Sequence, residues 1–158
     1  GTIVQLGSPE EVFSQPVNET VANFVGVETI LRGVVESQVD GFAHIRVGSD
    51  VSLAVSSFLP IGAKATVCIR PEEVTLLAFS EGATSEAGRQ SSSARNHFPG
   101  RVNKILPWGV VFKVHLDCGF PLVAFVTRPS VEELDLRDGQ TVIATFKATS
   151  VHVIAEAG

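Results

Sequence analysis

The sequence predicts a mainly β chain in which two small antiparallel units follow one another, preceded by a short helical connector. Three observations support this fold class. Apolar and polar residues alternate with a period of two in many short segments, as they do in strands with one buried face. A similar pattern recurs at a fixed offset along the chain. The composition, with 44% hydrophobic and 18% charged residues, excludes a disordered chain.

The first 26 residues differ from the rest and predict two short helices. Ser8 suits an N-cap, Pro9 suits the first helical position, and Glu11 completes a capping box. A second helix is expected from Asn18. Short helices need a surface to pack against, so we expect residues 1–26 to be a helical connector from the end of a preceding domain.

The next segment, residues 27–78, predicts a first β unit. Its alternating runs are broken by glycine, proline and aspartate, which is typical of short antiparallel strands. The runs lie at residues 34–35, 43–47, 51–55, 65–69 and 74–77. Residues 79–92 are rich in serine, glycine, glutamate and threonine, and we interpret them as a linker or mobile loop.

Residues 93–158 predict a second β unit. Strands are expected after Gly100 and at residues 110–117, 122–126, 142–146 and 151–154. Ser130 and Glu133 form another capping box, which predicts a short helix that begins at Ser130 and contains Leu134.

The two β units look like copies of each other. An offset of 77 residues places Gly62 on Gly139, Arg70 on Lys147 and Val74 on Val151, as the printed sequence shows. An internal duplication is the simplest explanation. Two five-stranded Greek-key barrels of the oligonucleotide/oligosaccharide-binding (OB) type would protect their strand edges in this arrangement.

Composition excludes several classes of function. The formal net charge of −5 argues against a broadly basic nucleic-acid-binding protein, and no run of about 20 apolar residues could span a membrane. Cys68 and Cys118 are far apart, which argues against a disulfide scaffold or zinc module and favours a reducing compartment. The chain begins at Gly1 and contains no methionine, so we expect it to be the tail of a longer protein.

Three segments combine a cation or an expected helix start with small hydroxyl side chains: residues 91–96, 127–130 and 147–150. A tetrahedral oxyanion only accepts hydrogen bonds, so each of its partners must donate. Arg95 and Lys147 would neutralise its charge. Ser93, Thr127, Thr149 and nearby backbone N–H groups would fix its orientation.

The helix expected at Ser130 would add a favourable potential for an anion. The alternative interpretation is that Arg95 pairs with a surface carboxylate while the hydroxyls cap turns. Neither cysteine is placed as a nucleophile, and the sequence contains no phosphate-binding loop. No arrangement of catalytic residues in the sequence therefore supports an enzymatic function.

These segments carry a family resemblance. Residues 92–156 resemble the molybdate-binding ("MOP", molbindin) version of the TOBE domain, at positions 93–96, 100–102, 123–127, 130, 134–136, 139 and 147–151. Residues 69–74 resemble the TOBE unit of importer ATPases, and residues 1–26 are similar to the end of their ATPase domains. The resemblance implies the C-terminal regulatory domain of a molybdate/tungstate ABC importer ATP-binding subunit.

The resemblance also implies how such a domain acts. Its ligand would be molybdate or tungstate, bound at interfaces between copies in a homodimer formed through the β units, and occupancy would stop transport by trans-inhibition. The fragment would hold no ATP site. Its partners would be the ATPase domain and transmembrane permease subunits, at the cytoplasmic face of the membrane, with no nucleic acid. The implied oxyanion-binding residues are Ser93, Ala94, Arg95, Asn96, Thr127, Ser130, Lys147, Ala148 and Thr149.

The first repeat departs from this pattern. Glu28 stands where the second repeat has Arg95, and Arg70 is followed by a proline and two glutamates. The first repeat therefore either lends Arg70 to a mixed site or is purely structural. Two alternative functions remain: a non-sensing dimerisation scaffold of an importer ATPase, and a free-standing oxyanion storage protein. No residue type distinguishes molybdate from tungstate.

Overall fold

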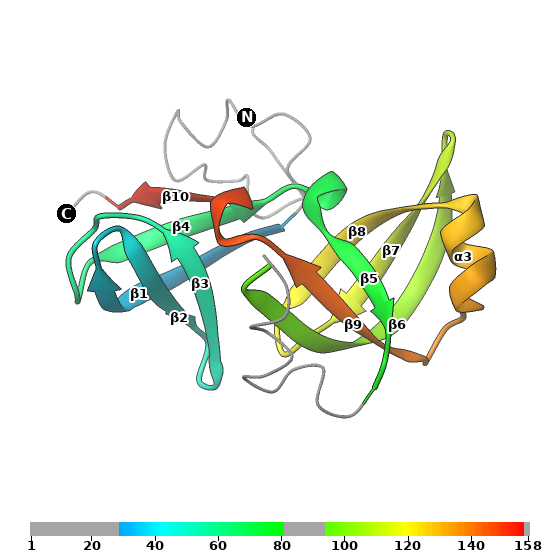
Figure 1. Cartoon of the computed structure of the whole chain (residues 1–158), viewed down its shortest axis with the longest axis horizontal. Coiled ribbons are helices and arrows are strands. Elements are labelled where there is room, and N and C mark those ends of the chain that lie inside the picture. Colours follow the sequence, from blue (N-terminus) through cyan, green and yellow to red (C-terminus); the bar gives the residue numbers. More distant parts are fainter. Residues whose placement is uncertain (1–28, 81–93, 157–158) are drawn as a thin grey trace. The chain divides into compact units, whose positions relative to one another are not determined.

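The computed structural model describes residues 29–80 and 94–156, and these form a mainly β structure in two compact units (Figure 1). The predicted fold class, tandem small β units, is confirmed in this part of the chain. The predicted helical connector 1–26 and most of the predicted linker 79–92 lie outside the described residues. No helix of the described part is long and apolar enough to cross a membrane.

The first unit is a five-stranded antiparallel sheet with the order β10-β4-β1-β2-β3. Its strands are β1 (Thr29–Val39), β2 (Phe42–Val47), β3 (Val51–Ser56), β4 (Lys64–Ile69) and β10 (Val151–Ala155). The edge strands β3 and β10 contact each other, so the sheet curls back on itself. Strands β1 to β3 form a meander and β4 returns beside β1, which is a Greek key.

The second unit repeats this arrangement with the order β5-β9-β6-β7-β8. Its strands are β5 (Thr75–Ala78), β6 (Asn96–Trp108), β7 (Val111–Asp117), β8 (Pro121–Thr127) and β9 (Thr141–Phe146). Helix α3 (Arg128–Leu134) connects β8 to β9. Two short 3-10 turns, η1 (Pro71–Glu73) and η2 (Ala148–Ser150), precede β5 and β10.

Two strands are exchanged between the repeats, which differs from the predicted segments 27–78 and 93–158. Strand β5 comes from the first repeat but pairs with β9, and β10 comes from the second repeat but pairs with β4. Residues 71–80 therefore group with the second unit, and residues 151–156 with the first. Alternation reports which face of a strand is buried but not which sheet it joins, so sequence could not reveal the exchange.

The duplication is visible strand for strand. β1 and β6 are the long strands, each pairs with two neighbours, and each carries an irregularity in register, at Val35/Ser37 and at Val102/Lys104. Both units bury their own apolar face. The largest fully buried side chains are Val35, Ile45, Leu53, Val55, Val67 and Ile69 in the first unit, and Leu116, Leu122, Ile143 and Phe146 in the second.

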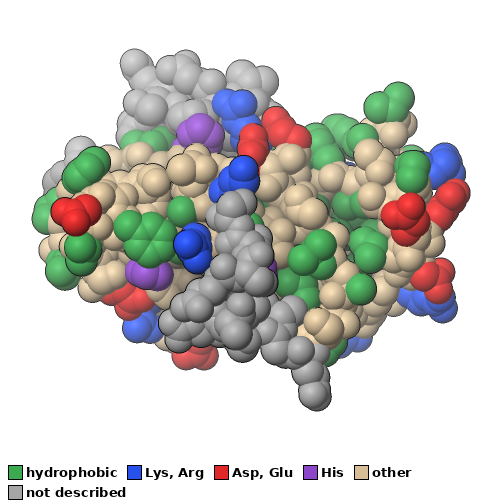
Figure 2. Space-filling view, viewed as in Figure 1, with side chains coloured by type: hydrophobic (Ala, Val, Ile, Leu, Met, Phe, Trp, Pro, Cys, Tyr) green, Lys and Arg blue, Asp and Glu red, His purple; other side chains and the backbone are tan. Residues whose placement is uncertain are grey.

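Acidic and basic side chains are interspersed on the visible face (Figure 2). The described residues carry as many Lys and Arg as Asp and Glu. The net charge of −5 therefore arises from the remainder of the chain, and the β units have no overall negative charge that would oppose an anion.

Candidate functional site

Two of the three predicted anion-binding segments meet at one end of the second unit. Asn96 begins β6 and pairs with Phe146, near the end of β9. Arg95 and Lys147 come directly before and after this last pair, so they lie beside each other at the same end of the sheet. Both are exposed, while Asn96 is buried. Ser93 lies outside the described residues.

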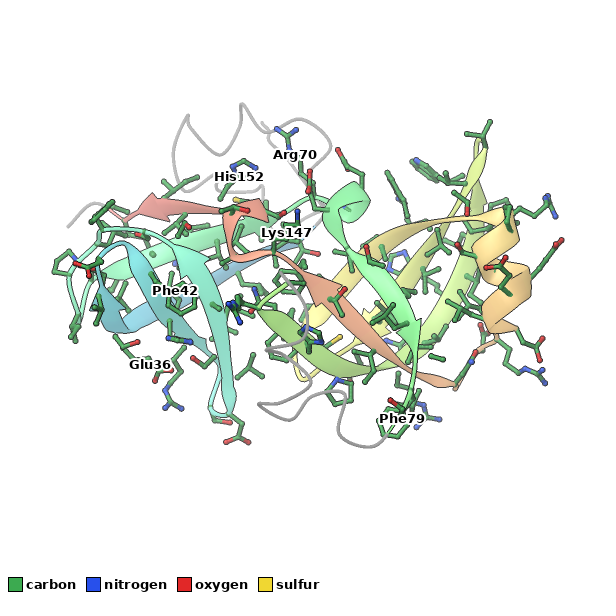
Figure 3. All side chains as sticks on the ribbon, viewed as in Figure 1. Glu36, Phe42, Arg70, Phe79, Lys147 and His152 are labelled. Atoms are coloured by element: carbon green, nitrogen blue, oxygen red, sulfur yellow. The ribbon has the colours of Figure 1, made fainter. Side chains whose placement is uncertain are left out.

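The chain turns sharply where β9 ends, at Lys147 (Figure 3). The Ser150 N–H donates to the Lys147 carbonyl at 2.9 Å, which closes the η2 turn. Ala148 is buried and anchors this turn, while Thr149 is exposed. The Ser150 hydroxyl donates to a Glu73 carboxylate oxygen at 3.0 Å, so one carboxylate contacts the turn.

The third segment, residues 127–130, lies elsewhere. Thr127 pairs with Val111, and Val111 pairs with Trp108, the last residue of β6. Asn96 is the first residue of that 13-residue strand. Figure 1 accordingly shows α3 and η2 at opposite ends of this unit. The structure therefore brings residues 94–96 and 147–149 together but places Thr127 and Ser130 apart from them.

Helix α3 begins at Arg128, not at Ser130 as the capping box predicted. Thr127 is the N-cap, and its hydroxyl accepts from the Ser130 N–H at 3.4 Å and donates to the Ser130 hydroxyl at 3.2 Å. Pro129 lies in the first turn, where its missing N–H costs nothing. The expected helix start at Ser130 is therefore wrong, and the helix has only seven residues.

The described part of the chain offers no alternative chemical centre of metal or thiol type. No group of three or more His, Cys, Asp or Glu side chains among these residues could hold a metal ion. Burial raises the pKa of the Cys68 and Cys118 thiols to about 12, which keeps both protonated and unreactive at neutral pH.

Sequence reasoning missed one residue beside the predicted segment. His97 is 4% exposed, and its Nε2 lies 2.7 Å from the Ala94 carbonyl oxygen. Its place directly after Asn96 was the available signal. The buried ring is not evident from sequence because the burial comes from chain segments that are distant in sequence.

The first unit has a different set of residues at the equivalent end. Thr29 takes the place of Asn96 and pairs with Ile69, and Arg70 follows as Lys147 follows Phe146. Glu28, which takes the place of Arg95, lies outside the described residues. Arg70 is half-buried, whereas Lys147 is exposed.

Comparisons with known proteins agree with this architecture. Residues 92–153 match the TOBE domain model. The chain is 38% and 32% identical, over 154 residues, to the molybdate/tungstate import ATP-binding proteins WtpC of Pyrococcus horikoshii and Pyrococcus abyssi. Each match covers 97% of this chain but only 40% of the relative. It is also 37% identical over 81 residues to the spermidine/putrescine import ATP-binding protein PotA of Acetivibrio thermocellus, covering 51% of this chain and 22% of the relative.

Among solved structures, the chain resembles the cytoplasmic molybdate-binding protein ModG in a crystal form with molybdate bound. The TM-score is 0.68 and the identity 22%, over 83% of this chain and 98% of ModG, which establishes the shared fold. Residues 92–153 therefore resemble the TOBE domain, in a chain similar over nearly its whole length to ATP-binding proteins of molybdate/tungstate import.

Proposed function

We propose that this chain is the oxyanion-sensing regulatory part of a molybdate/tungstate importer ATP-binding protein, and that it binds MoO4 or WO4 dianions. The observation that supports the proposal is the register of β6 and β9, because Arg95 precedes and Lys147 follows its last pair, Asn96 and Phe146. The sequence similarity to the WtpC proteins gives the chemical class of the ligand.

The residues at this end suit a tetrahedral dianion. Arg95 offers several N–H donors in a fixed plane and Lys147 a compact ammonium group, so together they can balance two negative charges. Thr149 is exposed in the η2 turn and adds a hydroxyl donor. Asn96, buried at the start of β6, directly follows Arg95 and belongs to the proposed set.

The proposed site is completed by a second copy of the chain. Thr127 and Ser130 cannot reach Lys147 within one unit, because they lie at the other end of β6. A neighbouring copy that presents its α3 end would supply these hydroxyls. Homodimerisation through the β units would then depend on the anion at the interface.

In the whole protein, this dependence would give regulation. We propose that the chain works in the cytoplasm, attached through the ATPase domain to transmembrane permease subunits. An oxyanion bound between two copies would hold the ATPase domains apart and stop import by trans-inhibition. The chain spans 40% of the WtpC relatives, so these steps concern the longer protein.

Titration calorimetry with tungstate, molybdate and sulfate tests the proposal. We expect saturable binding of tungstate and molybdate, and about a tenfold or greater loss of affinity for Lys147→Ala, because a charge-assisted hydrogen bond is removed. Lys64→Ala, at an exposed lysine at the start of β4, is the matched control and should leave the affinity unchanged. Absence of saturable heat with both heavy oxyanions would contradict the proposal.

A second candidate function is a dimerisation scaffold that senses nothing. The similarity to a spermidine/putrescine import protein over half the chain favours it, because the substrates of that importer are not oxyanions. Light scattering with and without tungstate separates the two functions. A scaffold dimerises to the same extent in both conditions, whereas the sensor dimerises more strongly with the anion.

A further inference from the structure

We infer that His97 is a positioning residue of the proposed oxyanion site, which orients the backbone N–H of Arg95 toward the anion. The inference rests on the proposed function. Nothing in the sequence comparisons assigns a role to this residue, and the resemblance described above does not include it.

The His97 ring is held by a hydrogen bond to the backbone. His97 Nε2 lies 2.7 Å from the carbonyl oxygen of Ala94, three residues earlier. A carbonyl oxygen only accepts, so Nε2 must carry the hydrogen. The Nδ1 atom is buried and has no hydrogen-bond partner in the described part of the chain. The bond to Ala94 is therefore the polar contact that fixes the ring.

The planarity of the peptide bond extends this constraint to Arg95. The Ala94 carbonyl and the Arg95 N–H belong to one trans peptide unit, in which C=O and N–H point in opposite directions. When His97 fixes the carbonyl, it also fixes the N–H, which points away from the ring. No described residue accepts a hydrogen bond from this N–H, so it can donate to a ligand.

The strand itself does not require a histidine at this position. In the first unit, the position equivalent to His97 is Ile30, opposite Cys68 in β4, while His97 lies opposite Thr145 in β9. The same fold thus forms with an apolar side chain at this position. The histidine occurs only in the repeat that also has Arg95 and Asn96, and the other repeat has Glu28 and Thr29 instead.

The experiment compares two substitutions at His97, of which only one keeps a side-chain nitrogen within reach of the Ala94 carbonyl. In His97→Gln the side-chain amide nitrogen takes roughly the place of Nε2 and can still donate to Ala94, whereas in His97→Asn the nitrogen takes the place of Nδ1 and cannot. We expect the tungstate Kd to rise about tenfold in His97→Asn, the effect of one lost hydrogen bond, but less than about threefold in His97→Gln. His115→Asn, on β7, is the matched control and should bind like the unsubstituted chain.

The outcomes separate this inference from the function on which it depends. If the unsubstituted chain does not bind tungstate, the proposed function fails and the inference fails with it. If it binds, equal affinities of both variants and the unsubstituted chain, or equally weak binding of both variants, would overturn the inference alone. Nitrogen NMR of the unsubstituted chain gives an answer even if a variant does not fold: a proton on Nε2 supports the inference, and a ring protonated only on Nδ1 overturns it.

Discussion

The two β units share one strand order but carry different chemistry at equivalent positions. In the second unit, Arg95 and Asn96 lead into the long strand and Lys147 follows β9. In the first unit, Glu28 and Thr29 lead into the long strand, and Arg70 follows β4. The Greek key therefore needs only the alternation and the turns, and it leaves the ends of these strands free to differ in charge.

A second difference lies between the third and fourth strands of each unit. Helix α3 fills this connection in the second unit, with Thr127 as its cap. The first unit has a shorter loop there, in which Phe58 and Ile61 are 78% and 67% exposed. Phe58 lies against Gly41, which has a φ of +86°. The hydroxyl-bearing α3 end is thus specific to the repeat that carries the cation pair.

The largest expected effect comes from giving the second unit the charge of the first. Arg95→Glu should abolish tungstate binding, by roughly a hundredfold or more, because it removes a charge-assisted donor and adds a repulsive carboxylate. Calorimetry measures the affinity. Glu28→Gln is the matched control, and its binding should not change. Retained affinity in Arg95→Glu would show that the two ends do not differ in function.

The next largest effect is the loss of folding stability when alanine replaces either of two equivalent glycines of the long strands, Gly33 and Gly100. A Cβ at Gly33 would lie 2.5 Å from the Arg46 backbone oxygen, whereas one at Gly100 would lie 2.7 Å from the Cys118 Sγ. Backbone yields less than a side-chain end, so we expect Gly33→Ala to lower the free energy of unfolding by about 3 kcal/mol and Gly100→Ala by about 1 kcal/mol.

Urea unfolding measures both values. The double variant Gly100→Ala/Cys118→Ala should recover most of the loss at Gly100, because the smaller side chain makes room for the new methyl group. Adding Cys118→Ala to Gly33→Ala should recover nothing. Equal losses in the two single variants would mean that the long strands approach their neighbours equally closely.

The smallest expected effect is a loss of folding stability at alkaline pH. Burial raises the pKa of Cys68 and Cys118 to about 12, from an ordinary value of 9.0, and Asp117 adds to the effect at Cys118. The folded chain therefore keeps these protons where the unfolded chain releases them, so stability is intact below the unfolded pKa and falls as pH rises above it. We expect a loss of about 1 kcal/mol per thiol by about pH 10.

Urea unfolding at about pH 8 and about pH 10 tests this expectation. The alkaline loss should shrink stepwise in Cys68→Ala and in the double variant Cys68→Ala/Cys118→Ala. If the pH dependence were the same in all three chains, the thiols would not be the titrating groups.

Much of the fold could be predicted from sequence. Alternation located most strands, although β1 and β6 begin earlier than expected, at Thr29 and Asn96. The Gly62–Gly139 equivalence indicated the duplication, and both glycines have positive φ. Helix α3 begins at Arg128 rather than at Ser130, because Thr127 and Ser130 both suit the N-cap position and Thr127 occupies it. The capping-box pattern alone cannot decide between the two residues.

For the candidate site, sequence supplied the residue types but not their grouping. Hydroxyl and cationic side chains at residues 91–96, 127–130 and 147–150 predicted donors for an oxyanion. The register of β6 with β9 and with β7 then brought two segments together and placed the third at the far end. His97 was missed because its partner is a backbone carbonyl, which no side-chain motif reveals.

The sequence by itself determined the local features of this protein: which residues alternate, where the turns fall, and which strand ends carry cations. These depend on neighbours within a few positions. Only the tertiary structure decided that β5 and β10 are exchanged between repeats, that Arg95 lies beside Lys147, and that Thr127 does not. The physical reason is that strand pairing is made by hydrogen bonds between distant segments, and alternation fixes the face of a strand without naming its partner.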